Sequence, residues 1–463
     1  MRLAYYILGV WVVAGWQLAL ADHPTAVQFR NTTSNVSFIG SRECSLCHSK
    51  IYQSYIRTPM GRSMGLASNA DQLEKVPASI TVVSPLFNRA YTVFREGSDL
   101  YQSEREYYSV SSYFITDKHK LEYVIGSGLH GQTYLVSRRH YLFQAPLSFY
   151  SKRQRWDLSP GYELAEFGFD RPISRGCLTC HTNSKLLLAS KGDQAVPSPA
   201  AKNQEVAIGC ENCHGPGQLH VAERRKGIKL SGGLDTSIVN PAKLPSQLAE
   251  DICMSCHQGK DLRLLQPGKD FCDFRPGRPL RETLAIFTIL PKRNDPPRSD
   301  LVDHHFSLKA SECYLKSQGR LSCLSCHNPH EEVPAEAAAD YYRSKCLTCH
   351  KETSCTLSLA ERARRRGTDD CAACHMPKRA PLEIPHAALT NHRIGGREGD
   401  PFPESEFQLI PELPGLIYLN GPSNQNADAL PMEVLQQAYE QLISKRPEYL
   451  KRYLIWRTQR NPH

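Results

Sequence analysis

The most regular hydrophobic pattern in the chain lies between residues 78 and 150. The stretches ITVVSPLFNRAYTVFREG, from Ile80, and KLEYVIGSGLHGQTYLVSRRHYLF, from Lys120, alternate apolar and polar residues and are rich in Val, Tyr, Phe and Thr. Alternation with a period of two places successive side chains on opposite faces of a strand, and Gly, Asn and Asp mark turns. The pattern therefore predicts a β-rich insert over 78–150.

Helical periodicity is clearest near the end of the sequence. MEVLQQAYEQLISKRPEYLKRYLIWRTQ, from Met432, repeats apolar residues three and four apart and predicts one helix within 431–463. The preceding stretch, 396–430, holds five prolines and predicts an extended linker.

The first residues have the pattern of an export signal. Arg2 precedes an apolar run, and Ala19-Leu20-Ala21 offers a site for cleavage, so 1–21 is predicted to be a signal peptide. An uncleaved anchor is the alternative, but Gly15 and Gln17 interrupt the apolar run. The mature protein is therefore expected in the periplasm or otherwise exported.

Seven copies of Cys-x-x-Cys-His carry the chemistry of the chain. This motif attaches c-type haem: two thiols add to the haem vinyl groups, and the histidine binds the iron from one side. The proximal histidines are His48, His181, His214, His257, His327, His350 and His375. The attachment cysteines are Cys44, Cys47, Cys177, Cys180, Cys210, Cys213, Cys253, Cys256, Cys323, Cys326, Cys346, Cys349, Cys371 and Cys374. The expected cofactor is seven covalently bound haem c groups.

Two other uses of paired cysteines explain the pattern less well. A zinc ribbon needs two Cys-x-x-Cys pairs but no histidine directly after each. A disulfide framework needs no such histidines either, and this chain is too long to depend on one. Fourteen of the 17 cysteines lie in the motifs. Of the remaining three, Cys313 and Cys355 are predicted to form a disulfide, and Cys272 is left over.

The spacing of the motifs sets the expected architecture. A first haem segment covers 22–77, the β-rich insert follows, and the six other motifs lie in a cytochrome region over 151–395. Porphyrin rings take the place of a side-chain core there, so little regular structure is needed. The predicted fold class is α+β: a haem-packed multihaem cytochrome c with short helices and much irregular chain, plus the β-rich insert after the first haem.

Each iron needs a second, distal ligand or keeps an open position, and neutral imidazole is the common choice. His330 stands three positions after its own motif, which is too close to wrap round the same ring, so it is expected to reach a neighbouring haem, most simply that of His350. The candidate distal ligands are His130, His220, His304, His305, His330, His386 and His392, with one ligand and one bystander expected from the pair at 304 and 305. For the seventh iron the alternatives are Met60, Met64, His119, His140 or an open position.

The formal charge of +9 does not predict a nucleic-acid partner. Seven ferric haems with ionised propionates would add about −7, which leaves the loaded protein close to neutral. The one dense basic run, Glu361–Gly367, is either a solvated helix face or a docking patch for an acidic redox partner.

Several motifs resemble those of a known family. CSLCHSKIYQSYIRTPMGRSM, CENCHGPGQLH, CLSCHNPH, CAACHMPK and HAALTNH are similar to segments of the bacterial multihaem cytochromes c related to the tetrahaem cytochromes of ammonia oxidisers, and CHNPH also resembles the doubled-motif cytochromes. The resemblance covers about residues 40–395 and implies electron transfer between haems. It also extends to enzymes, the hydroxylamine oxidoreductases and the multihaem nitrite and tetrathionate reductases, whose active haem lacks a distal protein ligand.

Two functional hypotheses follow. The first is an exported heptahaem cytochrome that passes electrons along closely packed, mostly bis-histidine haems to other redox proteins, with a membrane-associated electron-transfer complex as a further candidate setting. The second is an oxidoreductase in which one open iron binds a small nitrogen or sulfur oxyanion beneath a roof formed by the β insert, with Tyr134, His130, His140, Arg138 and Arg139 as candidate roof residues. Whether the chain is an enzyme stays open at this point, as does its oligomeric state.

Overall fold

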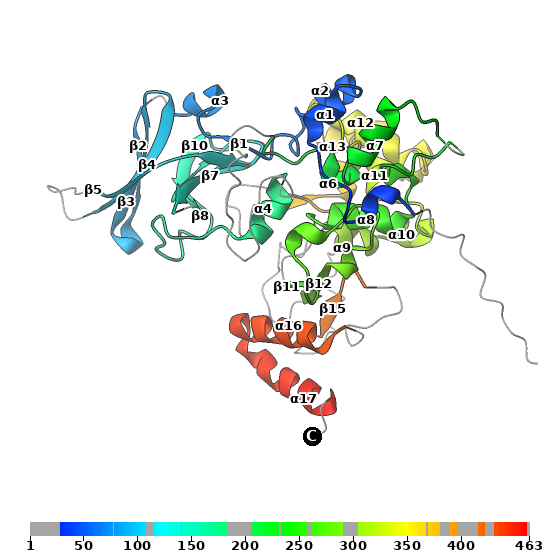
Figure 1. The fold of residues 1–463 in the computed structure, drawn as a ribbon. Coiled ribbons are helices and arrows are strands. Elements are labelled where there is room, and N and C mark those ends of the chain that lie inside the picture. The colour runs from blue at the N-terminus through cyan, green and yellow to red at the C-terminus, as the bar shows by residue number, and fades with distance from the viewer. Residues whose placement is uncertain are drawn as a thin grey trace, which may run out of the picture.

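The computed structural model describes residues 28–76, 78–107, 115–139, 141–183, 205–230, 233–257, 262–289, 304–366, 369–379, 389–396, 415–421 and 430–460. Short helices and small antiparallel sheets alternate with irregular chain, so the predicted α+β class is confirmed. Figure 1 shows three parts: a β-rich part, a helical part that holds most of the cysteine motifs, and a small sheet with two helices at the C-terminal end.

The predicted β-rich insert is present and consists of two sheets. One is β2–β3–β4–β5, all antiparallel, and the other is β1–β6–β7–β9–β10 with β8 paired to β7. The strands are β1 Met64–Leu66, β2 Ile80–Ser84, β3 Arg89–Glu96, β4 Asp99–Glu106, β5 Ile115–Lys120, β6 Tyr123–Ile125, β7 Gly131–Arg138, β8 Tyr141–Gln144, β9 Leu147–Tyr150 and β10 Arg155–Leu158. The second sheet thus takes up strands on both sides of the predicted range.

A hydrophobic cluster and one buried amide hold these sheets together. Tyr134 and Trp156 stack at 4.9 Å between ring centroids, within a cluster that draws on both sheets. The side chain of Gln102 on β4 donates to the carbonyl of Leu147 and accepts from its amide, each at 2.9 Å. Because both polar ends of this buried amide are bonded, the link carries no desolvation penalty from an unpaired group.

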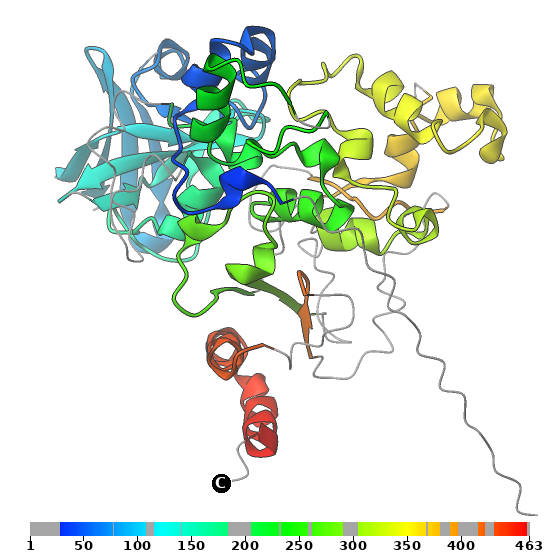
Figure 2. The same ribbon diagram turned by 45° about the vertical axis from the view of Figure 1, so that its right-hand side comes forward.

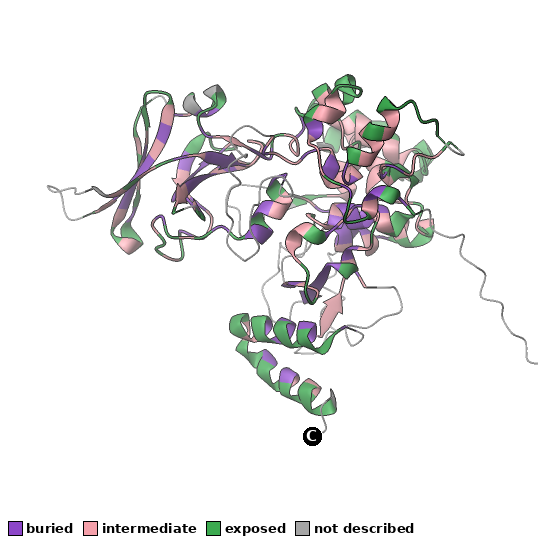
Figure 3. Ribbon diagram, viewed as in Figure 1, coloured by how far each residue is buried: buried purple, intermediate pink, exposed green. Residues whose placement is uncertain are grey.

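The helices of the haem-motif region are short. They are α1 Ser41–Ser45, α2 Ser49–Tyr55, α3 Ala70–Leu73, α4 Arg175–His181, α6 Glu211–His214, α7 Gln218–Arg225, α8 Ser246–Met254, α9 His304–Lys309, α10 Glu312–Ser317, α11 Cys323–Cys326, α12 Ala338–Cys346, α13 Leu359–Arg366 and α14 Cys371–His375. Single 3-10 turns lie at Arg30–Thr32, Pro85–Phe87, Pro241–Lys243, Phe271–Asp273, Leu280–Glu282, Glu352–Ser354 and Pro447–Tyr449. Many residues of the motif helices are exposed or half-buried, in contrast to the β strands (Figure 3).

The C-terminal part differs from the prediction in two ways. The sheet β11–β12–β15 (Leu262–Leu265, Leu284–Ile289, Leu416–Tyr418) takes its last strand from the stretch predicted as a linker. The predicted single helix is two helices, α16 Met432–Lys445 and α17 Leu450–Arg460 (Figure 2). Arg446 leaves helical geometry because Pro447 follows it, and a residue before proline disfavours the helical region.

Some predicted features lie outside the described residues: the signal peptide at 1–21, and 397–414 and 422–429 of the linker. A small hairpin, β13 Lys378–Arg379 with β14 Leu389–Thr390, flanks another undescribed stretch that includes His386. Over the part of the chain that is described, no helix has the length and apolar character needed to cross a membrane.

The core between the C-terminal sheet and α16 gives a stability test. Phe287 on β12 is fully buried, and its ring lies 5.6 Å from that of Tyr418 on β15. Replacing it with alanine in Phe287→Ala removes this contact and leaves a cavity, so the free energy of unfolding should fall by about 3–5 kcal/mol. Guanidinium unfolding followed by circular dichroism measures the loss. Leu454→Ala on α17, where the side chain is half exposed, should change it little, and equal losses in both variants would contradict the assigned core.

Candidate haem-iron sites

We number the motifs 1 to 7 in chain order, so that site 1 ends at His48 and site 7 at His375. Within a motif, one helical turn brings both cysteines and the histidine together. The amide of the histidine donates to the carbonyl of the first cysteine at sites 1, 3, 4, 5 and 6, with N–O distances of 2.9, 3.0, 2.7, 3.0 and 2.9 Å. The local backbone therefore has the one-turn geometry that haem attachment needs.

Four proximal histidines face a second histidine ring. Two imidazoles that bind one metal ion from opposite sides, each with a metal–nitrogen distance of about 2.0–2.1 Å, have ring centroids about 6 Å apart. The observed centroid separations are 6.4 Å for His48–His220, 6.0 Å for His214–His330, 5.7 Å for His257–His304 and 6.1 Å for His327–His392. The structure thus brings together four pairs with the spacing of a bis-histidine iron site, at sites 1, 3, 4 and 5.

The position of His330 corrects one sequence expectation. Its ring lies nearly parallel to that of His214, at an interplanar angle of 8°, and not against His350. Glu332, two positions later, pairs with Arg62 of the first haem segment at 3.3 Å. The loop after site 5 therefore runs back toward the N-terminal segment, and the motif next in sequence is not the one that it approaches in space.

The neighbouring histidines at 304 and 305 have different surroundings. His304 faces His257, whereas His305 is buried and its Nε2 bonds Glu250 at 3.1 Å. Burial, with a smaller effect of nearby imidazoles, lowers the pKa of His304 to about 3 and that of His392 to about 4. Both rings are therefore neutral at physiological pH, which is the form that binds iron.

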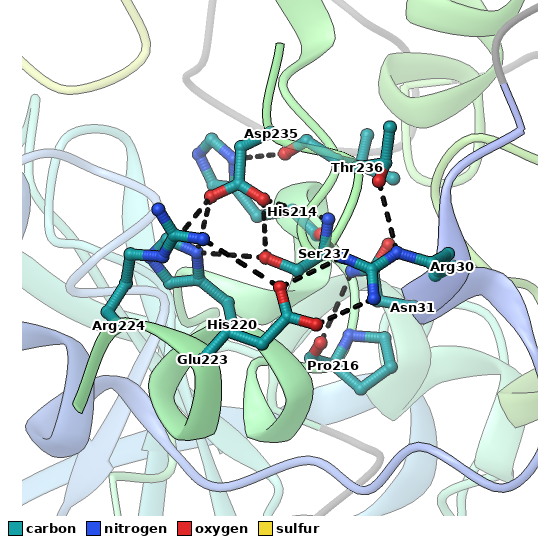
Figure 4. Close-up of polar contacts among 11 residues, drawn as sticks. Arg30, Asn31, His214, Pro216, His220, Glu223, Arg224, Asp235, Thr236 and Ser237 are labelled. Carbon is teal, nitrogen blue, oxygen red and sulfur yellow. Dashed lines mark hydrogen bonds and ion pairs between the residues drawn. The ribbon is translucent and has the colours of Figure 1, made fainter. Parts of the chain in front are cut away.

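Hydrogen bonds at Nδ1 orient several of these rings. His214 and His392 donate from Nδ1 to the carbonyls of Val239 and Thr390, at 2.8 and 3.0 Å. A carbonyl only accepts, so Nδ1 carries the proton and Nε2 is the free nitrogen. His220 instead donates to the carboxylate of Asp235 at 2.9 Å (Figure 4). Such outer partners fix the ring that a metal ligand presents.

The proximal histidines of sites 2, 6 and 7 differ from these. Among the described residues no histidine ring is found opposite His181, His350 or His375. His375 nevertheless has the same orienting bond, from Nδ1 to the carbonyl of Gly395 at 2.8 Å. His181 and His350 are exposed, whereas His375 is half-buried.

The remaining candidate ligands lie elsewhere. His130 stands just before β7, where burial and the nearby Lys378 lower its pKa. Met64 is buried in a hydrophobic cluster, and Nε2 of His119 on β5 lies 2.8 Å from a carboxylate oxygen of Asp117. Met60 is half-buried in the turn after α2. His386 and His140 lie outside the described residues, as do His23 and His463.

Contacts between cysteines of different motifs indicate which sites are neighbours. Thiols lie within hydrogen-bonding reach in the pairs Cys44–Cys210, Cys180–Cys256, Cys253–Cys323 and Cys346–Cys371. These contacts join site 1 to 3, 2 to 4, 4 to 5 and 6 to 7. Cys213 of site 3 packs against a hydrophobic cluster that includes Ile252 and Met254 on α8, the helix that carries Cys253 of site 4, and α11 of site 5 packs against α12 of site 6. The sites therefore form a row in the order 1, 3, 4, 5, 6, 7, with site 2 joined at site 4.

One buried carboxylate ties site 1 to site 3. Glu211, within the site 3 motif, accepts from the amides of Ile39 at 3.0 Å, Gly40 at 2.7 Å and Gly217 at 2.7 Å. Gly40 has φ +86°, a conformation that favours glycine, and it directly precedes α1. A single charge thus fixes the start of the site 1 helix against the turn that follows His214.

Two further expectations are wrong. Cys313 and Cys355 are both free thiols, and Cys313 lies near the site 5 and site 6 cysteines instead. Tyr134 does not roof a pocket, because it is fully buried in the β core with its hydroxyl bonded to Gln72 at 2.8 Å. Arg138, another proposed roof residue, donates to the carbonyl of Phe169 at 3.1 Å and pairs with Asp170.

The basic run on α13 is partly neutralised within the chain. Arg362 pairs with Asp369 at 2.9 Å, and both side chains are mostly buried. Arg364 and Arg365 pair with Glu361 on the same helix, at 2.8 and 3.0 Å. These contacts are those of a solvated helix face with internal ion pairs.

The donor set fits haem. Each of the four pairs presents two imidazoles, and each motif supplies two thiols one turn apart. Within the described ranges there is no cluster of three or more His, Cys, Asp or Glu side chains of the kind that a tetrahedral zinc site takes.

No protein-family model and no curated protein matches the chain. Among solved structures it is similar to the crystal structure of the outer cell wall cytochrome OcwA, with a TM-score of 0.44 and 14% identity over 77% of this chain and 79% of that chain. At this TM-score the likeness carries no weight for function, which rests on the motifs and the histidine pairs.

The carboxylate of Glu211 gives a test of the link between sites 1 and 3. In Glu211→Gln the charge is lost and an amide group faces backbone donors, so the free energy of unfolding should fall by about 1.5–3 kcal/mol. Chemical denaturation of the haem-loaded protein measures this. Glu43→Gln, which removes a carboxylate from an exposed ion pair with Arg225, should have little effect. A loss no larger than that of the control would contradict the assigned role.

Proposed function

We propose that the chain is an exported heptahaem c-type cytochrome that transfers electrons along closely packed, mostly bis-histidine haems. The observation that carries the proposal is the set of four histidine pairs with ring centroids 5.7–6.4 Å apart, each pair containing the histidine of a Cys-x-x-Cys-His motif. An iron held by protein ligands on both sides has no open position for a substrate, which favours electron transfer over catalysis at these four sites.

When bound, haem supplies a one-electron ferric/ferrous couple. The residues of this chain attach the haem, bind its iron and orient the ligands. The motif cysteines fix each ring covalently, the paired imidazoles hold the iron, and partners such as Val239 and Thr390 keep each ring in the tautomer that binds metal. Burial of His304 and His392 keeps those ligands neutral.

Contacts between motifs support close packing. A thiol of site 4 lies within hydrogen-bonding reach of one from site 2, and another of one from site 5. Cofactors attached there would be neighbours, as a path for electrons requires. The expected partners are other redox proteins, and the N-terminal segment supports export.

The alternative, a multihaem oxidoreductase acting on a small nitrogen or sulfur oxyanion, needs one open iron. Sites 2, 6 and 7 are where that hypothesis is to be tested, because the four other sites have a facing ring.

The first experiment is low-temperature EPR of the oxidised protein with iron quantified alongside. Seven irons per chain with only low-spin signals would support the electron-transfer proposal. A near-stoichiometric high-spin signal that changes with nitrite or cyanide would instead favour the oxidoreductase.

A pair of variants tests the assignment at site 4. His304→Ala removes the ring opposite His257, so one low-spin iron per chain should become high-spin. The control, His305→Gln, keeps a donor for Glu250 and should leave all spin states unchanged. A new high-spin signal in the control, or none in His304→Ala, would contradict the pairing.

A further inference from the structure

The orienting bonds of the paired histidines are not equivalent. His214 and His392 donate to backbone carbonyls, and the nearest partner described for Nδ1 of His327 is the hydroxyl of Tyr342, at 3.4 Å. His220, which faces His48 at site 1, instead meets a carboxylate: its Nδ1 lies 2.9 Å from Oδ2 of Asp235. At site 1 the Nδ1 of a candidate ligand therefore meets a negatively charged carboxylate. The Nδ1 atoms of His214, His327 and His392 have neutral partners instead.

The carboxylate is held in place by its own surroundings. Its Oδ1 accepts from the backbone amide of Ser237 at 2.8 Å and from the hydroxyl of the same residue. Arg224 approaches Oδ2 at 3.9 Å, and the side chain of Asp235 is only 19% exposed (Figure 4). Ser237 is fully buried. Asp235 thus cannot swing away from His220 without breaking these bonds.

A carboxylate that accepts from Nδ1 changes the electron donation of the histidine ligand as well as the orientation of its ring. It draws the Nδ1 proton toward itself and makes Nε2 a stronger electron donor than a backbone carbonyl does. A stronger donor stabilises the more positive ferric iron over the ferrous iron, and the reduction potential of that haem falls.

We propose that Asp235 is a positioning residue that lowers the reduction potential of the site 1 haem, because it sets a carboxylate against Nδ1 of His220. The inference rests on the proposed function, because it assumes haem iron between His48 and His220. Site 1 is one end of the row that runs through sites 3, 4 and 5. A lowered potential at that end favours electron flow away from site 1.

The test is the variant Asp235→Asn, with redox titration followed by EPR. An amide keeps the shape and still accepts from Nδ1, but it lacks the charge. Mutation of an outer-shell partner typically costs a metal site about 10–100-fold in affinity. If the loss falls on the ferric form, a tenfold loss raises the potential of one haem by about 59 mV. The other haems should keep their potentials.

Three further variants make the result specific. His220→Ala turns the site 1 iron high-spin and so identifies its signal. Glu223→Gln removes a nearby carboxylate that pairs with Arg30 at 2.6 Å but has no described bond to an axial histidine, so it controls for a general loss of charge. Asp235→Glu restores the charge and should recover part of the low potential.

The outcomes separate the two claims. A site 1 potential that is unchanged in Asp235→Asn, or that rises equally in Glu223→Gln, overturns the role of Asp235 while leaving the histidine pair intact. Failure of His220→Ala to produce one high-spin iron overturns the pairing itself, and with it part of the proposed function.

Discussion

Two imidazoles facing one iron position from opposite sides form the constraint on which the rest of this structure depends. The motif histidine is fixed locally by one helical turn, but its partner comes from a distant segment, as His220 does for His48 and His330 for His214. Every such pair closes a long loop, and under the proposed function the bonds at the iron would offset the entropy lost in closing it. The chain is therefore organised by pairs across iron sites more than by contacts between helices.

This constraint explains why regular structure is distributed so unevenly. The largest hydrophobic clusters lie in the β-rich part and between the C-terminal sheet and α16. The motif helices are one to three turns long, which is marginal for any helix without tertiary support. Bonds such as those that Glu211 accepts from the amides of Gly40 and Gly217 hold these helices in position. Under the proposed function, attached porphyrins would supply the apolar contacts that side chains supply elsewhere.

Features that depend on neighbouring residues could be predicted from the sequence, whereas contacts between segments far apart in the chain could not. The motifs and the alternating strands are short-range patterns, and the presence of the β insert followed from them. The partner of His330 could not be predicted in this way. The loop that carries His330 is drawn toward the N-terminal segment by the ion pair of Glu332 with Arg62, and these two segments are far apart in the chain. The choice between His304 and His305 depended on Glu250, which sequence spacing does not bring near. Pro447 ends α16, but the helical periodicity continues on both sides of this residue, and the pattern therefore predicted one helix where there are two.

The sites do not follow their sequence order in space, and this arrangement makes site 4 a branch point. Cys256 of site 4 meets Cys180 of site 2, and Cys253 of the same motif meets Cys323 of site 5. With Cys213 of site 3 also nearby, site 4 has three neighbours. Under the proposed function, an electron that reaches site 4 from site 1 through site 3 would have two ways onward, through site 2 or through site 5. Because His304 faces His257 at this junction, the ligands and burial of site 4 affect both branches at once.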